Sequence, residues 1–154
     1  MENDLVELIF KGYQKGGELS YELINKLYNF SKKNRKKLSQ REKDDLGEKL
    51  LESCKSKNIK CSIEAILQGA SVNFKDIEGN TPLLEAVRND DIFFLKILLH
   101  LKAEPDVLND LKESPIILAV EKGNKEILKT LIDNACDLNL KNSRGKTPLI
   151  LAIE

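Results

Sequence analysis

The feature that most constrains the fold is a six-residue sequence that recurs twice at a spacing of 33 residues. Residues 81–86 read Thr-Pro-Leu-Leu-Glu-Ala, and related sequences stand at residues 114–119 and 147–152. A fixed period of this length is typical of proteins built from structural repeats. Thr or Ser can cap a helix by accepting a backbone N–H, and Pro suits the first helical position, which needs no N–H donor. Each copy therefore predicts the start of a helix.

A second helical pattern follows each of the first two copies. Its apolar residues share one helical face, and they are Phe94, Leu95, Leu98 and Leu99, then Ile127, Leu128, Leu131 and Ile132. A turn of small residues follows, and the chain then returns to the next Thr-Pro or Ser-Pro. We therefore expect pairs of helices, with loops near residues 74–80, 107–113 and 140–146 that point the same way.

In these features the chain resembles the ankyrin repeat family. The family pattern D-x-x-G-x-T-P-L-H-x-A, a second helix and G-A-D-V-N match residues 76–154 closely and reach back loosely to about residue 47. The resemblance implies an all-α solenoid of stacked antiparallel helix pairs with hairpin-like loops. Two departures are specific. The family's His is replaced by Leu or Ile, and Lys112 replaces a loop glycine, which should strain that turn if it needs a positive φ.

The expected organisation is an N-terminal helical cap over residues 1–46 and a repeat domain over residues 47–154. The repeats are about 47–75, 76–108 and 109–141, with a partial repeat at 142–154. The first repeat lacks Thr-Pro, so its first helix should merge with the helix before it. A capping-box sequence at residues 39–42 predicts where that merged helix begins.

Two further expectations concern the ends of the repeat domain. The second helix of the first repeat fits best with a one-residue slip that places Ile63, Ile66 and Leu67 in the core. The partial last repeat lacks a second helix, so Leu149 and its neighbours Ile150 and Ile153 should be poorly covered. Two explanations stay open. The natural chain continues past Glu154, which we favour, or the half-repeat serves as a crude C-terminal cap.

Two helices are predicted before residue 39. One apolar stripe lies between Leu5 and Phe10, glycines at positions 12, 16 and 17 should end that helix, and a second stripe lies between Leu23 and Tyr28. Five basic residues then fall within residues 32–37. We interpret this basic run as a solvated linker. A nuclear-import or nucleic-acid patch, and attraction to an acidic partner or lipid surface, are the alternatives.

The composition of the chain argues against several classes of partner and cellular compartment. The formal net charge is zero, so no global field favours nucleic acid or a membrane as partner. The longest apolar run, near residues 92–101, is interrupted by Lys96 and His100 and is too short to span a bilayer. Three cysteines, without a C-x-x-C pair, argue for free thiols in a reducing compartment. We therefore expect a cytoplasmic protein, with delivery into a host cell left open.

Nothing in the sequence predicts an active site, a metal or a cofactor. Gly145-Lys146-Thr147 resembles the end of a phosphate-binding loop, but Leu140 stands where that motif needs its first glycine. His100 is the only histidine, so the chain lacks the ligands of the usual mixed Cys/His zinc sites. Near a helix end, His100 is most simply a favourable partner of the helix dipole. We therefore predict that the chain is not an enzyme and takes no small-molecule substrate.

The family resemblance implies protein–protein recognition through first helices and loop tips. We therefore expect a binding module or scaffold for another protein, whose identity the sequence does not determine. The alternative is the regulatory or targeting part of a longer enzyme or effector. The candidate partner-binding residues are Phe74, Glu85, Arg88, Leu108, Leu111, Leu118, Glu121, Lys122, Leu140, Arg144 and Leu151.

These candidates are interpreted as an apolar strip with a charged rim. In the family pattern the residue before the conserved Ala faces the concave side, which would place Leu118 and Leu151 there. Exposed strips of this kind often mark interfaces. The alternative is that these leucines merely cover neighbouring repeats. A competing convex surface is formed by Ile92, Phe93 and Leu101.

Overall fold

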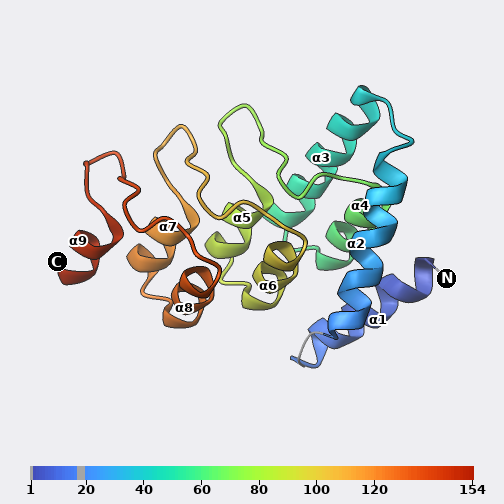
Figure 1. Cartoon of the computed structure of the whole chain (residues 1–154), viewed down its shortest axis with the longest axis horizontal. Helices are drawn as coiled ribbons and strands as arrows, with labels where there is room; N and C mark the ends of the chain where they lie inside the picture. Colours follow the sequence, from blue (N-terminus) through green and yellow to red (C-terminus); the bar gives the residue numbers. More distant parts are fainter. Residues whose placement is uncertain (1, 17–19) are drawn as a thin grey trace. The chain divides into compact units, whose positions relative to one another are not determined.

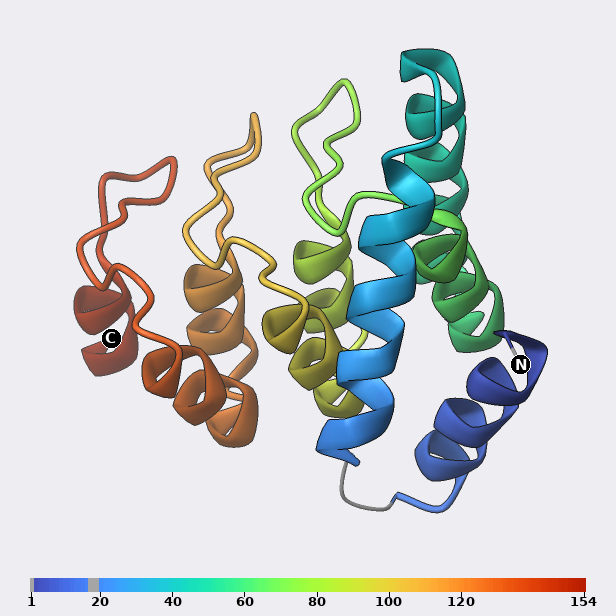
Figure 2. The same cartoon turned by 45° about the vertical axis from the view of Figure 1, so that its right-hand side comes forward.

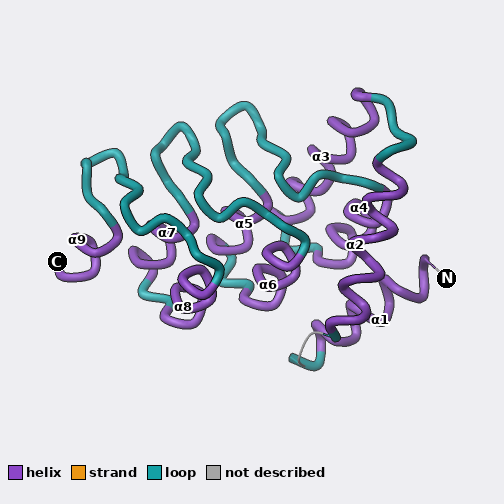
Figure 3. The backbone as a smooth tube through the Cα atoms, in the orientation of Figure 1, coloured by secondary structure: helices purple, strands orange, loops and turns teal. Residues whose placement is uncertain are grey.

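The computed structural model describes residues 2–16 and 20–154, and these residues form helices and loops without a strand (Figure 1 and Figure 3). The all-α prediction is therefore confirmed. The helices are α1 (Glu2–Gln14), α2 (Tyr21–Arg35), α3 (Gln40–Lys55), α4 (Ile59–Gln68), α5 (Pro82–Arg88), α6 (Ile92–His100), α7 (Pro115–Lys122), α8 (Lys125–Asp133) and α9 (Pro148–Ile153). The chain divides into two compact units, residues 1–74 and residues 75–154.

In the first unit, α4 is the central helix, because α1, α2 and α3 all pack against it. Both predicted stripes supply this contact, with Ile9 of α1 and Leu27 of α2 fully or almost fully buried. The prediction that Gly12 helps to end the first helix is wrong, since α1 continues to Gln14. Gly16 follows in a left-handed conformation with φ 60°, and Gly17 lies outside the described residues.

The merged helix predicted from the capping box is confirmed as α3. Ser39 accepts a hydrogen bond from the backbone N–H of Glu42, and the Glu42 side chain accepts one from the backbone N–H of Ser39. Ser53 occupies the place of the conserved Ala, and its hydroxyl donates to the carbonyl of Leu50 at 2.8 Å. Local hydrogen bonding thus satisfies a polar side chain at a helix-packing position.

The one-residue slip predicted for the first repeat is wrong, although the residues that it placed in the core, Ile63, Ile66 and Leu67, are all buried. Asn58, Asp91 and Asn124 cap the helices α4, α6 and α8, and each stands one full repeat period from the next. Ile63 is nevertheless fully buried, although Lys96, its equivalent in the next repeat, is exposed. The reason is tertiary. Because α1 and α2 cover α4, that helix buries a wider surface than its two counterparts do.

Positive φ angles recur with the repeat period more regularly than particular residue types do. They recur with the repeat period in three series, at positions 57, 90 and 123, at 69, 102 and 135, and at 79, 112 and 145. Only four of these nine residues are glycines. The backbone of residues 57–69 therefore follows the repeat geometry although its sequence fits the family pattern only loosely.

The second unit contains α5 paired with α6, α7 paired with α8, and α9. Thr81, Ser114 and Thr147 cap α5, α7 and α9 by accepting a backbone N–H three residues later, as predicted. Ala86 and Ala119 are almost completely buried at the helix contacts. The loops before α5, α7 and α9 extend to the same side of this unit in both views (Figure 1 and Figure 2).

The basic run is not the linker that the sequence suggested. Residues 32–35 form the last turn of α2, and only Lys36 and Lys37 lie beyond it. Cations at a helix C-terminus interact favourably with the helix dipole, and this interaction explains the basic residues in the last turn of α2. Lys32 also lies over the ring of Tyr28, with 6.0 Å from its ammonium nitrogen to the ring centroid.

Candidate functional site

The second unit displays three polar hairpins of the same design. The backbone N–H of Asn109 donates to the carbonyl of Glu113 at 3.1 Å, and equivalent bonds close residues 76–80 and 142–146. The side chain at the first position reinforces the turn, as Asn109 Oδ1 accepts from the Glu113 N–H at 2.9 Å. Asp and Asn favour such turns because their short side chains bond the nearby backbone. We call these segments hairpin 76–80, hairpin 109–113 and hairpin 142–146.

A groove of about 480 Å³ lies between hairpins 109–113 and 142–146, and we call it the hairpin groove. It brings together three of the predicted partner-binding residues, Leu111, Glu121 and Arg144. All three are exposed. The full lining consists of Asp110, Leu111, Lys112, Glu113, Ile117, Glu121, Asn142, Ser143 and Arg144. The hairpin groove thus joins an apolar loop tip to charges of both signs.

Arg88 is half-buried and is engaged by two carboxylates of the second unit. Its guanidinium forms ion pairs with Glu85 and Glu113 and donates a hydrogen bond to Asn80 Oδ1 at 3.1 Å. Burial acts to lower the pKa of Arg88, but the hydrogen bond with Glu113 and the charge of Glu85 outweigh it and raise that pKa. Arg88 and the buried Glu85, both predicted to face a partner, therefore serve as an internal cross-link between hairpin 109–113 and α5.

Asn80 and Asn109 complete this cross-link, and neither residue was predicted from the sequence. They are buried, and Asn109 Nδ2 donates to Asn80 Oδ1 at 3.0 Å and to Glu113 Oε2 at 2.7 Å. A signal was present in the sequence, because Asp76, Asn109 and Asn142 recur with the repeat period. A buried amide must be hydrogen-bonded to avoid a large desolvation cost, so this regular polar position indicated a network.

Lys122, another predicted partner-binding residue, is also engaged within the second unit. Its ammonium donates to the carbonyl of Arg88 at 3.0 Å and forms an ion pair with Asp90 at 2.9 Å. These contacts tie the C-terminal end of α7 to the C-terminal end of α5. Lys122 therefore lies outside the hairpin groove and contributes to the contact between neighbouring helix pairs.

The predicted leucine strip is interrupted at Leu118. This residue is only 8% exposed, because α7 lies between α5 and α9 and packs against both. Leu108, Leu140 and Leu151 are half-buried. On the competing convex surface, Ile92 and Phe93 are half-buried as well, and Leu101 is buried. Neither set forms a strip of fully exposed apolar side chains.

Phe74 belongs to the first unit, so the structure does not bring it into the hairpin groove. Its ring lies over Gly47 of α3, where an added Cβ would come within 2.1 Å of Phe74 Cδ2. Gly47 is buried and leaves the space that the half-buried ring occupies. Phe74 is therefore placed by packing on α3.

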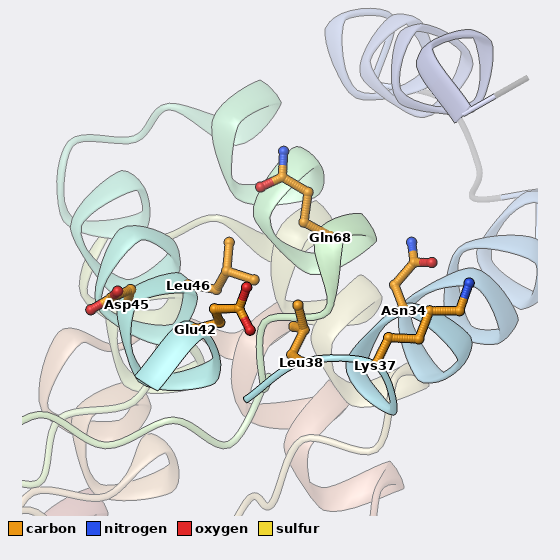
Figure 4. A pocket seen from close by; sticks show the side chains of 7 residues that line it. All are labelled: Asn34, Lys37, Leu38, Glu42, Asp45, Leu46 and Gln68. Carbon is orange, nitrogen blue, oxygen red and sulfur yellow. The ribbon is translucent and has the colours of Figure 1, made fainter. Parts of the chain in front are cut away.

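A second hollow lies in the first unit, at the end of the basic run (Figure 4). It measures about 450 Å³ and is lined by Asn34, Lys37, Leu38, Glu42, Asp45, Leu46 and Gln68. Two of its polar groups already have structural partners. Asn34 Nδ2 donates to the carbonyl of Leu67 at 2.8 Å, and Glu42 forms the capping box of α3.

The groups that could carry chemistry are each accounted for by the fold. Thr147 caps α9, Gly145 has a φ of 72°, and Lys146 forms an ion pair with Glu154, so the Gly-Lys-Thr sequence serves the last hairpin. The pKa of His100 is lowered by burial and by the charge of Lys102, which disfavours the charged form predicted to partner a helix dipole. Residues 2–16 and 20–154 contain no group of three potential metal ligands.

None of the helices in the described part of the chain has the length and apolar character needed to cross a bilayer.

A comparison with protein families found a match to the model for ankyrin repeats (3 copies) over residues 84–154. This range includes α6, α7, α8, α9, most of α5 and the whole hairpin groove. A comparison with curated proteins found no match.

Proposed function

Residues 84–154 of this chain belong to the ankyrin repeat family, and we propose that they bind another protein through the hairpin groove. Ankyrin repeats are generally protein–protein interaction modules. The proposal concerns a protein ligand, and it assigns no role to nucleic acid or to a small-molecule substrate. The partner's contact surface would include an apolar residue and charges of both signs.

The observation that carries this proposal is the arrangement of Leu111, Glu121 and Arg144. Leu111 is 67% exposed at the tip of its hairpin, which is large for a leucine side chain. Among the described residues, no ion pair engages the side chain of Glu121 or Arg144, although both line the same groove. An apolar contact flanked by complementary charges supplies both affinity and orientation at protein interfaces.

The cross-link below the groove supports the same function. Arg88 and Asn109 donate to Glu113, and Asn80 accepts from both of them, so the wall formed by hairpin 109–113 is anchored to α5 before a partner arrives. A surface that is already ordered loses less conformational entropy on binding. Because hairpin 109–113 is already fixed, a partner could bind it without first rearranging the loop.

We further propose a non-catalytic role in a reducing compartment such as the cytoplasm. The residues that line the hairpin groove include Ser143 but neither a histidine nor a cysteine that could activate it or act in its place. The three cysteines are free, and two of them, Cys54 and Cys136, are buried. Burial, followed by the charge of Asp106, raises the pKa of the Cys136 thiol, so this thiol stays protonated and unreactive.

The test is affinity capture with the whole chain as bait, in parallel with two variants. The groove variant is Leu111→Asp with Arg144→Glu, and both positions are exposed, so folding should be unaffected. The control is Ile77→Asp, since Ile77 is 99% exposed on hairpin 76–80 and does not line the hairpin groove. We expect the captured partner to be lost with the groove variant and kept with the control. Equal capture by all three chains would refute the proposed site.

A further inference from the structure

A second groove of the second unit is entirely apolar, and we call it the end groove. It measures about 180 Å³ and lies beside α9. Its lining residues are Ile116, Val120, Leu128, Ile132, Leu138, Pro148, Leu149 and Ala152. None of them lines the hairpin groove, so the two surfaces can be altered separately.

The repeat period shows what the end groove lacks. Leu149 is 72% exposed, whereas Ile116, its equivalent one repeat earlier, is 0% exposed. Ile132 is 47% exposed, and its equivalent Leu99 is 8% exposed. The same surface is therefore covered in the preceding repeat and uncovered beside α9.

In the preceding repeat the cover is α8. This helix packs against α6 and α7 (Figure 1), and its residues Ile127 and Leu131 are both completely buried. They stand four residues apart, so they lie on one face of the helix. The end groove is the next copy of the surface that α8 fills, and α9 has no second helix beside it (Figure 2).

A charge pair specifies the docked helix further. Lys96 of α6 pairs with Glu126 of α8 at 3.5 Å, and Glu126 directly precedes the first buried residue, Ile127. Lys129 is the equivalent of Lys96 one repeat later, is exposed, and forms no ion pair with the described residues. A helix in the end groove would therefore meet an available cation where α8 meets Lys96.

We propose that the end groove binds an amphipathic helix of a partner protein. That helix carries an acidic residue for Lys129, an apolar residue directly after it, and a second apolar residue four positions later. Helices recognised by grooves are commonly read through apolar residues at such spacings. Burial of Leu149, Ile132 and Leu138 drives the association, and Lys129 selects the register and direction of the helix.

The probe is a fluorescent peptide of residues 124–136, which we call the α8 peptide. A covalent staple joins its positions 125 and 129, both exposed in α8, because so short a helix is marginal in water. Fluorescence anisotropy with the whole chain should show saturable binding. Leu149→Asp should weaken it by about tenfold or more, because it removes a buried leucine contact. The control Ile77→Asp should bind the α8 peptide as the unaltered chain does.

A charge exchange tests the register. An α8 peptide with Glu126→Lys should bind about two- to fivefold more weakly at low salt, as expected for an exposed ion pair. Lys129→Glu in the chain should restore binding of that altered peptide. If neither change alters the affinity, the acidic residue is not recognised and the proposed register is wrong.

Three other outcomes would overturn the proposal. The α8 peptide could fail to bind, or it could bind Leu149→Asp with unchanged affinity. Sedimentation could instead show a dimer that Leu149→Asp dissociates, in which case a second copy of this chain covers the groove. The variant Leu111→Asp with Arg144→Glu should still bind the α8 peptide, so that this test and the test of the hairpin groove can fail independently.

Discussion

Replacing Gly47 by Ala should destabilise the protein, although the same change stabilises most helices. Gly47 lies within α3, and a Cβ added there would stand 2.1 Å from Cδ2 and 2.5 Å from Cγ of Phe74. These atoms belong to the inner part of the ring, so a small rotation of the side chain cannot move them away. The ring or the helix must shift to accept the methyl group.

Two opposing effects set the expected change in the free energy of unfolding for Gly47→Ala. Alanine is better than glycine in a helix interior by about 0.8–1.0 kcal/mol. Overpacking of a close contact costs about 1–3 kcal/mol. The difference predicts a loss of about 0–2 kcal/mol in the free energy of unfolding for Gly47→Ala. With Phe74→Ala already present, the clash is absent, and Gly47→Ala should then stabilise by about 0.8–1.0 kcal/mol.

Tyrosine fluorescence during urea unfolding measures this reversal. The chain has three tyrosines, Tyr13, Tyr21 and Tyr28, and no tryptophan, so the signal comes from the unit that contains both Gly47 and Phe74. Comparison of the four chains in a double-mutant cycle isolates the coupling between the two positions. If Gly47→Ala has the same sign and size in both backgrounds, Phe74 does not occupy the space above Gly47.

Ala86→Leu and Ala119→Leu should each lower the free energy of unfolding by about 1–3 kcal/mol through overpacking, whereas Ala152→Leu, at the equivalent exposed position, should be nearly neutral; urea unfolding followed by far-ultraviolet circular dichroism measures all three. Lys112→Gly should stabilise by about 0.5–1 kcal/mol, because removing the cost of φ 59° outweighs the larger conformational entropy that glycine loses on folding, while Lys112→Ala should change little. The lowered pKa of His100 means that the unfolded chain binds more protons, so stability should fall as the pH drops below about 6.5, and His100→Gln should remove that part of the pH dependence.

Local patterns in the sequence predicted the elements that local physics controls. The caps at Thr81, Ser114 and Thr147 needed only a hydroxyl and a neighbouring backbone N–H, and the structure has all three. The capping box at residues 39–42 located the start of α3 for the same reason. The strain expected at Lys112 is confirmed by its φ of 59°, because turn geometry repeats with the sequence period.

The candidate site was predicted only in part. Leu111, Glu121 and Arg144 share the hairpin groove, because two loop tips and the end of α7 are exposed beside one another. Arg88 was predicted at the rim of an interface and is engaged by Glu85 and Glu113. Its partner Glu113, on hairpin 109–113, is 25 residues away in the chain, and local sequence patterns do not predict contacts between residues so far apart.

The sequence by itself determined the repeat period, the starts of α3, α5, α7 and α9, and the turn positions. Tertiary structure decided the burial of residues outside the predicted apolar stripes. Leu118 is buried because α5 and α9 flank α7, and Ile63 is buried because α1 and α2 cover α4. The physical reason is that a cap or turn depends on atoms a few residues away, whereas burial depends on which distant helices pack against a face.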